Sequence, residues 1–168
     1  MHKSRLTLHE IALFGILGAL TFGIKVAMAF LPNIEPVSLM LMLFAVTFGW
    51  KALYPTYLYV VLEVLLYGLN LWNINYLYVW AILVVAAIFL RRWKNPLVWA
   101  LLSGLFGLAF GLLCCPVYAV LGGWDYAFRW WLSGLPFDYT HAIANFIIAL
   151  VLFVPLRNLL QKLYAKFQ

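Results

Sequence analysis

The sequence has 168 residues, of which 67% are hydrophobic and only 10% are charged. A soluble domain averages about a quarter charged residues, so this composition excludes an ordinary soluble protein and predicts a single integral membrane domain over residues 1–168. The formal net charge of +6 does not require a nucleic-acid partner, because basic residues on the cytoplasmic face and contact with anionic membrane lipid account for it.

Apolar runs of helical length predict an all-α bundle of six membrane-spanning helices. In chain order we expect them at approximately 8–31, 37–49, 52–69, 76–90, 97–121 and 136–156. The second run is short for a full crossing, which needs about 20 residues. We expect loops at 70–75 and at the aromatic segment 122–131, and we expect Pro136 in the first turn of the sixth helix.

The basic residues are distributed asymmetrically between the two sides of this bundle. With six spans, nine of them fall at the two termini and in the segments 49–51 and 91–96. On the other side only Arg129 remains, and Lys25 lies inside the first span. The positive-inside rule therefore predicts that both termini are cytoplasmic.

The first span has two different faces. Small residues recur on one of them at steps of three or four residues, which suits close approach of a partner helix: Ala12, Gly15, Ala19, Gly23 and Ala27. Nearly opposite lie Phe14, Gly18, Thr21 and Lys25. We therefore expect one face to dock on a partner and the other to face a polar cavity.

Polar side chains inside the spans predict an outward-facing binding pocket. In the third span Thr56, Tyr59, Glu63, Tyr67 and Asn70 share one helical face, and in the sixth Asp138, His141 and Asn145 do so. Charged groups inside a membrane span face the bundle interior or a water-filled cavity. The predicted substrate-binding residues are Lys25, Tyr59, Glu63, Tyr67, Asn70, Asn75, Trp131, His141 and Asn145.

Structural roles for the same residues stay open. Lys25 and Glu63 can simply neutralise each other, while His141 and Asn145 can act as hydrogen-bonding links between helices. The tryptophans of the outer segments can form an interfacial aromatic belt or a lid over a planar ligand. No spacing typical of a metal site, a catalytic constellation or a phosphate loop is present, so we expect no enzymatic activity, no metal and no cofactor.

Two segments carry a resemblance to a known family. They are 31–37 (Leu-Pro-Asn-Ile-Glu-Pro-Val) and 134–138 (Gly-Leu-Pro-Phe-Asp), the second followed by His141, Asn145 and a closing Pro155-Leu156. With the length, the six expected spans and the small-residue first helix, the chain resembles the substrate-binding S component of an energy-coupling factor (ECF) transporter, the bacterial vitamin importers.

The resemblance implies a function and a set of partners. Such a protein binds a vitamin or related micronutrient near the outer surface of the bacterial plasma membrane. It docks through its first helix on a transmembrane T subunit that is coupled to two cytoplasmic ATPases. The cargo stays open, because Lys25 would suit a carboxylate or phosphate and Glu63 a ring amine. Alternatives are a structural six-span protein of the cell-shape machinery and an intramembrane enzyme that uses His141 and Glu63.

Overall fold

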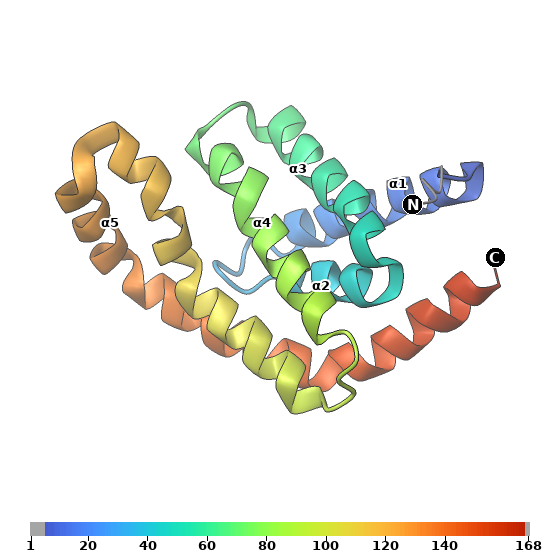
Figure 1. The fold of residues 1–168 in the computed structure, drawn as a ribbon. Helices are drawn as coiled ribbons and strands as arrows, with labels where there is room; N and C mark the ends of the chain where they lie inside the picture. Colours follow the sequence, from blue (N-terminus) through green and yellow to red (C-terminus); the bar gives the residue numbers. More distant parts are fainter. Residues whose placement is uncertain (1–5, 167–168) are drawn as a thin grey trace.

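The computed structural model describes residues 6–166, which form helices joined by short turns, with no strand in this range (Figure 1). Its elements are α1 (Leu8–Ala27), α2 (Val37–Phe48), the 3-10 helix η1 (Gly49–Ala52), α3 (Leu53–Tyr67), α4 (Leu71–Leu90) and α5 (Pro96–Ala165). Four helical stretches are long and apolar enough to cross a membrane: Leu8–Ala27, Val37–Tyr67, Leu71–Leu90 and Pro96–Ala165. The predicted all-helical class is confirmed, and the apolar helices are those of a membrane-embedded protein.

The start of α1 is fixed by its own sequence. Thr7 and Glu10 form a capping box, in which each side chain accepts a hydrogen bond from the other residue's backbone N–H at 3.1 Å. The helix ends at Ala27, four residues before the predicted end, and turns lead through Asn33 to α2. This early end leaves residues 28–35 free to line a cavity, as described below.

Glycine creates the break between α2 and α3. Gly49 has φ +58°, a conformation that side-chain-bearing residues rarely adopt, and it begins the single turn of η1. The α2 helix has only 12 residues, so it is about 18 Å long at 1.5 Å per residue. The expectation of a short second helix, separated from the third near residues 49–51, agrees with this geometry.

The predicted loop at 70–75 is wrong. The α4 helix already begins at Leu71, because Asn70 caps it by accepting a hydrogen bond from the Trp72 N–H at 2.9 Å. The Asn73 side chain in turn accepts one from the Asn70 N–H at 2.8 Å. The cluster of asparagines that suggested a loop is thus a helix N-terminus.

The α5 helix is bent back on itself at Gly123, whose φ of 81° and ψ of 170° are non-helical (Figure 1). We call 96–122 its first arm and 124–165 its second arm. The arms pack antiparallel: Trp99 stacks on Phe153 with ring centroids 4.2 Å apart, and Tyr118 stacks on Trp130 at 3.7 Å.

Two expectations for this region are wrong. The aromatic segment 122–131 is helical apart from the break at Gly123, and Pro136 lies inside the second arm instead of its first turn. Glycine, not a long loop, therefore makes the reversal between the arms.

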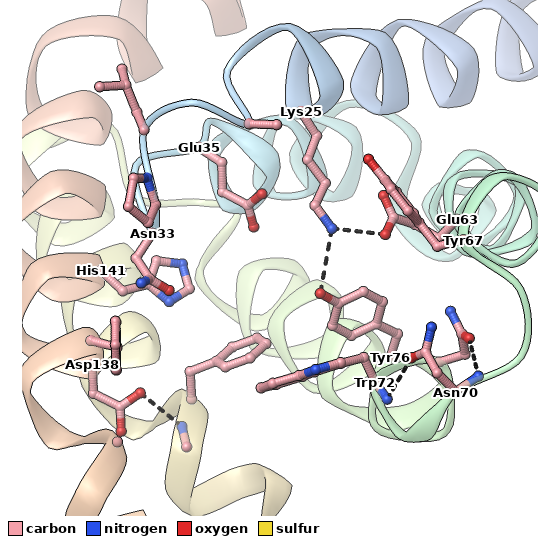
Figure 2. A pocket seen from close by; sticks show the side chains of 18 of the residues that line it. Lys25, Asn33, Glu35, Glu63, Tyr67, Asn70, Trp72, Tyr76, Asp138 and His141 are labelled. Carbon is pink, nitrogen blue, oxygen red and sulfur yellow. Dashed lines mark hydrogen bonds and ion pairs between the residues drawn. The ribbon is translucent and has the colours of Figure 1, made fainter.

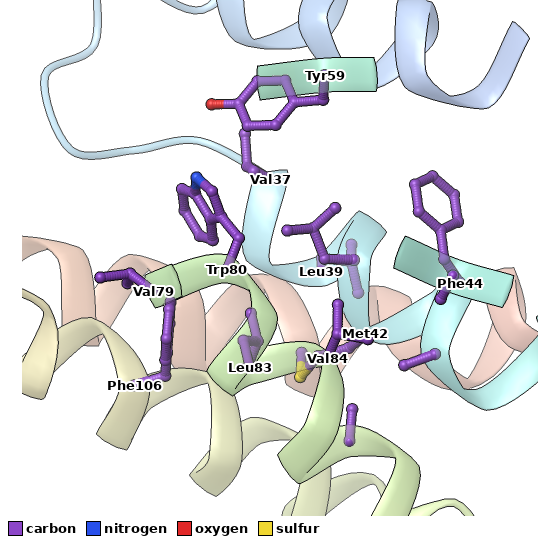
Figure 3. Close-up of a cluster of buried hydrophobic side chains, with 14 of the residues drawn as sticks. Val37, Leu39, Met42, Phe44, Tyr59, Val79, Trp80, Leu83, Val84 and Phe106 are labelled. Carbon is purple, nitrogen blue, oxygen red and sulfur yellow. The ribbon is translucent and has the colours of Figure 1, made fainter. Parts of the chain in front are cut away.

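The core surrounds α2, the most buried helix (Figure 3). Leu39, Met42 and Phe44 of α2 are almost completely buried, and so are Trp80 and Leu83 of α4. The hydrophobic cluster also includes residues of α1, α3 and both arms of α5. A short helix with no polar face is thus enclosed by longer ones, which accounts for its sequence being apolar except for Ser38 and Thr47.

The segments rich in basic residues gather at one end of the bundle, which we call the basic end. Glu10 Oε1 accepts hydrogen bonds from Lys51 Nζ at 2.6 Å and from the Tyr164 hydroxyl at 3.0 Å. Arg157 donates to the carbonyl oxygens of Arg91 at 3.1 Å and of Trp93 at 2.9 Å. Contacts thus join the start of α1, η1, the α4–α5 connection and the C-terminal part of α5.

Candidate functional site

A cavity of about 750 Å³ lies between the helices, away from the basic end (Figure 2). It is lined by the end of α1 and the turns after it, the end of α3, the start of α4 and both arms of α5. Its charged and titratable lining residues are Lys25, Glu35, Glu63, Asp138, His141, Tyr67 and Tyr76. A space of this size is typical of small-molecule sites.

The Lys25–Glu63 ion pair forms one wall of the cavity. Lys25 Nζ of α1 lies 2.8 Å from Glu63 Oε2 of α3 and 3.4 Å from the Tyr76 hydroxyl of α4. The helices approach closely because Gly18 faces α3, where an added Cβ would lie 2.9 Å from the Pro55 carbonyl oxygen. The ion pair is therefore built on a glycine contact two helical turns away.

Glu35 adds a second carboxylate from the turns between α1 and α2. Figure 2 shows its side chain directed toward the Lys25 ammonium. Burial raises the pKa of the Glu35 carboxyl above its ordinary value; the Lys25 ammonium opposes this shift, and Glu63 adds to it. Glu35 therefore takes up a proton more readily than an exposed glutamate does.

The opposite wall carries Asp138 and His141 on the second arm of α5 (Figure 2). Asp138 Oδ1 accepts a hydrogen bond from the Gly111 N–H at 3.1 Å, and a Cβ on Gly111 would come within 2.5 Å of Asp138 Oδ2. Gly107 likewise allows the His141 backbone to approach, since an added Cβ would lie 2.9 Å from its carbonyl carbon. Gly107 and Gly111 of the first arm thus allow the second arm, which carries Asp138 and His141, to approach closely.

Aromatic rings complete the lining. Trp72, Tyr76, Phe110, Trp130 and Trp131 all border the cavity. Trp130 is held between two other rings, because it stacks on Tyr118 and lies 6.0 Å from Trp72, centroid to centroid. Of the outer tryptophans that could form a lid or a belt, Trp72, Trp130 and Trp131 lie at the cavity, whereas Trp124 is exposed and does not line it.

The structure brings six of the nine predicted binding residues to this cavity. They are Lys25, Glu63, Tyr67, Asn70, Trp131 and His141. The polar atoms of Asn70 are already used, because its side chain caps α4 and its amide nitrogen donates to the Gly68 carbonyl at 3.2 Å. Asn70 therefore lines the cavity but has few free hydrogen-bonding groups to offer a ligand.

The other three predicted residues do not line the cavity. Asn145 donates to the Ser38 hydroxyl at 3.1 Å and lies 3.4 Å from the Ser103 carbonyl oxygen, so it links helices. Asn75 accepts a hydrogen bond from the Tyr78 hydroxyl at 3.0 Å. Tyr59 is fully buried behind the ion pair, with the Lys25 ammonium 5.7 Å from its ring centroid. For Asn145, the alternative of a hydrogen-bonding link fits this geometry.

The predicted list of binding residues omits several residues that the structure places at the cavity: Glu35, Tyr76 and Phe110, and also Asp138, which was predicted only to share the polar face of His141. For Asp138 a signal was present, because it precedes His141 by three residues and so shares its helical face. Glu35 follows a helix by eight residues, and no periodicity could place it. Phe110 resembles any other apolar residue of a span.

Buried polar atoms without a hydrogen-bond partner mark the cavity as a site for a ligand. Within residues 6–166 these include Glu63 Oε1, Asp138 Oδ2 and His141 Nε2. A buried polar group without a partner costs about 1–3 kcal/mol. A ligand that donates hydrogen bonds to the carboxylate oxygens and pairs with His141 Nε2 would remove that cost.

The predicted docking face of α1 carries no packing partner in the described chain. Ala12, Ala19, Gly23 and Ala27 are exposed and Gly15 is half-buried. A Cβ added at Gly15 or Gly23 would meet nothing within 4 Å, whereas Phe14, Gly18 and Thr21 of the other face are buried. The two faces of α1 thus differ as the spacing of its residues predicts.

No protein-family model, curated protein or solved structure matches the chain. The function is therefore inferred from the geometry of the site and the pattern of the sequence.

Proposed function

We propose that this protein is the substrate-capturing S component of an ECF-type importer in the bacterial plasma membrane. The observation that carries the proposal is the polar cavity, in which three nearly fully buried side chains of an apolar helical protein present atoms that have no partner among residues 6–166. A purely structural membrane protein has no need of such a cavity, because each unpartnered atom lowers its stability.

The proposed topology is six crossings with both termini in the cytoplasm. It is supported by the break at Gly49 and by the reversal at Gly123, which divide two of the four long apolar stretches into pairs of helices. The contacts at the basic end add support, because they gather Lys51, Arg91 and Arg157 at the end away from the cavity. With the basic end in the cytoplasm, the cavity opens outward.

In this proposal the small-residue face of α1 docks on the T subunit, and two ATPases supply the energy. The exposure of this face in the isolated chain is consistent with a partner helix, since glycine and alanine permit close backbone contact inside a membrane. The cargo is a vitamin-like small molecule held in the cavity, and the chain itself catalyses no reaction.

The test is to isolate the tagged full-length protein from its native membrane and to identify what accompanies it. We expect a second multi-span protein and two ATPase subunits, and uptake of the cargo that stops when either ATPase is inactivated. Recovery of cell-shape proteins without any ATPase would instead favour the structural alternative.

A further inference from the structure

We infer that the cavity selects a ligand that carries a cationic nitrogen on or beside a planar ring. This inference deepens the proposed capture function and rests on it. It names the charge and shape of the cargo, which the sequence alone leaves open between an anionic and a cationic group.

The charges of the lining favour a cation. Three carboxylates (Glu35, Glu63 and Asp138) face the cavity against the single ammonium of Lys25. That ammonium is already paired with Glu63 at 2.8 Å, so its charge is largely offset before any ligand binds. Within the described chain neither Glu35 nor Asp138 forms a salt bridge, and an anionic ligand would be repelled by both.

Among the unpartnered atoms of the lining, the carboxylate oxygens need hydrogen-bond donors, whereas the Trp131 indole N–H is itself a donor. Glu63 and Asp138 are only 4% and 5% exposed, and within the described residues Glu63 Oε1 accepts no hydrogen bond, while Asp138 Oδ2 is approached by the Trp131 indole N–H without a hydrogen bond of good geometry. Ionised carboxylates are acceptors only, so the group that satisfies them must donate. A protonated amine or a ring N–H does this, and charge-assisted hydrogen bonds of this kind are stronger than neutral ones.

The shape of the cavity favours a planar ring between two acidic walls. Figure 2 shows Glu63 on one side, Asp138 and His141 on the other, and Trp72 and Tyr76 between them. Phe110 and Trp131 add further aromatic surface. Aromatic faces attract cations as well as rings, so the aromatic lining and the carboxylates favour the same class of ligand.

The experiment uses three probes that share an indole ring and differ in side-chain charge: tryptamine (cation), tryptophol (neutral) and indole-3-propionate (anion). Their binding to the full-length protein in detergent is measured by equilibrium dialysis. We expect tryptamine to bind about ten- to a hundredfold more tightly than indole-3-propionate, with tryptophol between them.

Matched variants locate the source of this preference. Asp138→Asn and Glu35→Gln each remove one charge with little change of shape and should reduce the preference for tryptamine by about tenfold. Asp125→Asn is the control, because Asp125 is exposed, pairs with Arg129 and does not line the cavity. It should leave all three affinities unchanged, and melting temperatures confirm that each variant is folded.

A second measurement identifies any small molecule released from the purified protein by mass spectrometry, and we expect it to carry a basic or cationic nitrogen. Equal affinity for the three probes, tighter binding of the anion, or release of a purely anionic molecule would each overturn the inference. These results would leave the capture function standing if the ATPases still accompany the protein. Absence of ATPases would count against the proposed function, whatever the order of the probes.

Discussion

Lys25 and Glu63 show how one contact can have two roles. Their 2.8 Å pair links α1 to α3, and the same residues border the cavity with Glu63 Oε1 unpartnered. An ion pair between the two helices and contact of its residues with cargo are therefore compatible in this structure, although the sequence presents them as alternatives. Removing one partner or both separates the two contributions.

We expect the double variant Lys25→Met, Glu63→Gln to be more stable than either single variant but no better at binding cargo. Each single change leaves a charge without its partner and should lower the free energy of unfolding by about 3 kcal/mol, whereas the double change leaves none. Thermal melting of the four proteins in detergent gives the stability, and titration with tryptamine gives the affinity. Full recovery of affinity in the double variant would remove both residues from the binding site.

Glu35 should make the stability of the ligand-free protein depend on pH. Because its pKa is raised in the folded state, the folded protein holds this proton more firmly than the unfolded chain does, and stability falls as pH rises above the ordinary value of 4.5. The Glu35→Gln variant should therefore gain stability relative to the wild type at pH 8 and gain little at pH 4. A difference that grows toward low pH would contradict the raised pKa.

The sequence predicts residues of the site best where they follow helical periodicity. Glu63, Tyr67 and His141 were found because polar residues at such spacing must share a face. Asn145 followed the same rule but is satisfied by Ser38 and Ser103, which come from other helices and could not be anticipated as its partners. Contact with cargo and contact with a neighbouring helix produce the same pattern along one helix.

At the scale of elements, α1 is the clearest case in which small residues serve two purposes. Gly18 contacts α3, where an added Cβ would lie 2.9 Å from backbone, while a Cβ added at Gly23 would meet no atom of the described residues within 4 Å. Spacing alone separates these faces, but it does not say which glycine packs within the chain. In the structure Gly18 is the glycine that packs within the chain, so the two positions can be tested as a pair.

We expect Gly18→Leu to impair folding stability and Gly23→Leu to impair assembly with the T subunit. Leucine at position 18 should lower the free energy of unfolding by about 1–3 kcal/mol or more, because it overpacks the contact with Pro55 and Leu58. Leucine at position 23 should leave melting and tryptamine binding unchanged but prevent copurification of the T subunit. Normal assembly of the Gly23→Leu protein would show that another surface docks.

Element boundaries were predicted less well than the elements themselves, for a physical reason. Asparagine favours both loops and helix N-termini, so residues 70–75 read as a loop, although Asn70 only caps α4. The segment 124–131 is polar and aromatic enough to suggest a loop, but it carries no residue that breaks a helix. Only the unusual backbone of Gly123 was needed for the turn.

At the scale of the whole molecule, two opposite ends have different chemistry. The basic end is fastened by Glu10, Lys51 and Tyr164, whose contacts join segments up to 154 positions apart. The cavity lies at the other end, where carboxylates and tryptophans gather. This polarity connects the charge pattern of the sequence to the proposed direction of capture, and it can be tested without knowing the cargo.

We expect a cysteine at position 125 to be reached from outside intact cells and one at position 94 only after the membrane is opened. Both positions are exposed; position 94 lies just before the first arm of α5 and position 125 just after the break that ends it. Asp125→Cys and Lys94→Cys are made in a protein that carries Cys114→Ala and Cys115→Ala, and a membrane-impermeant maleimide reports labelling.

A reporter fused after residue 168 should be on the same side as position 94, because the second arm of α5 crosses back. Labelling of both cysteines in intact cells would contradict the crossing of the first arm. A reporter on the outer side would contradict the crossing of the membrane by the second arm, and with it the six-span topology.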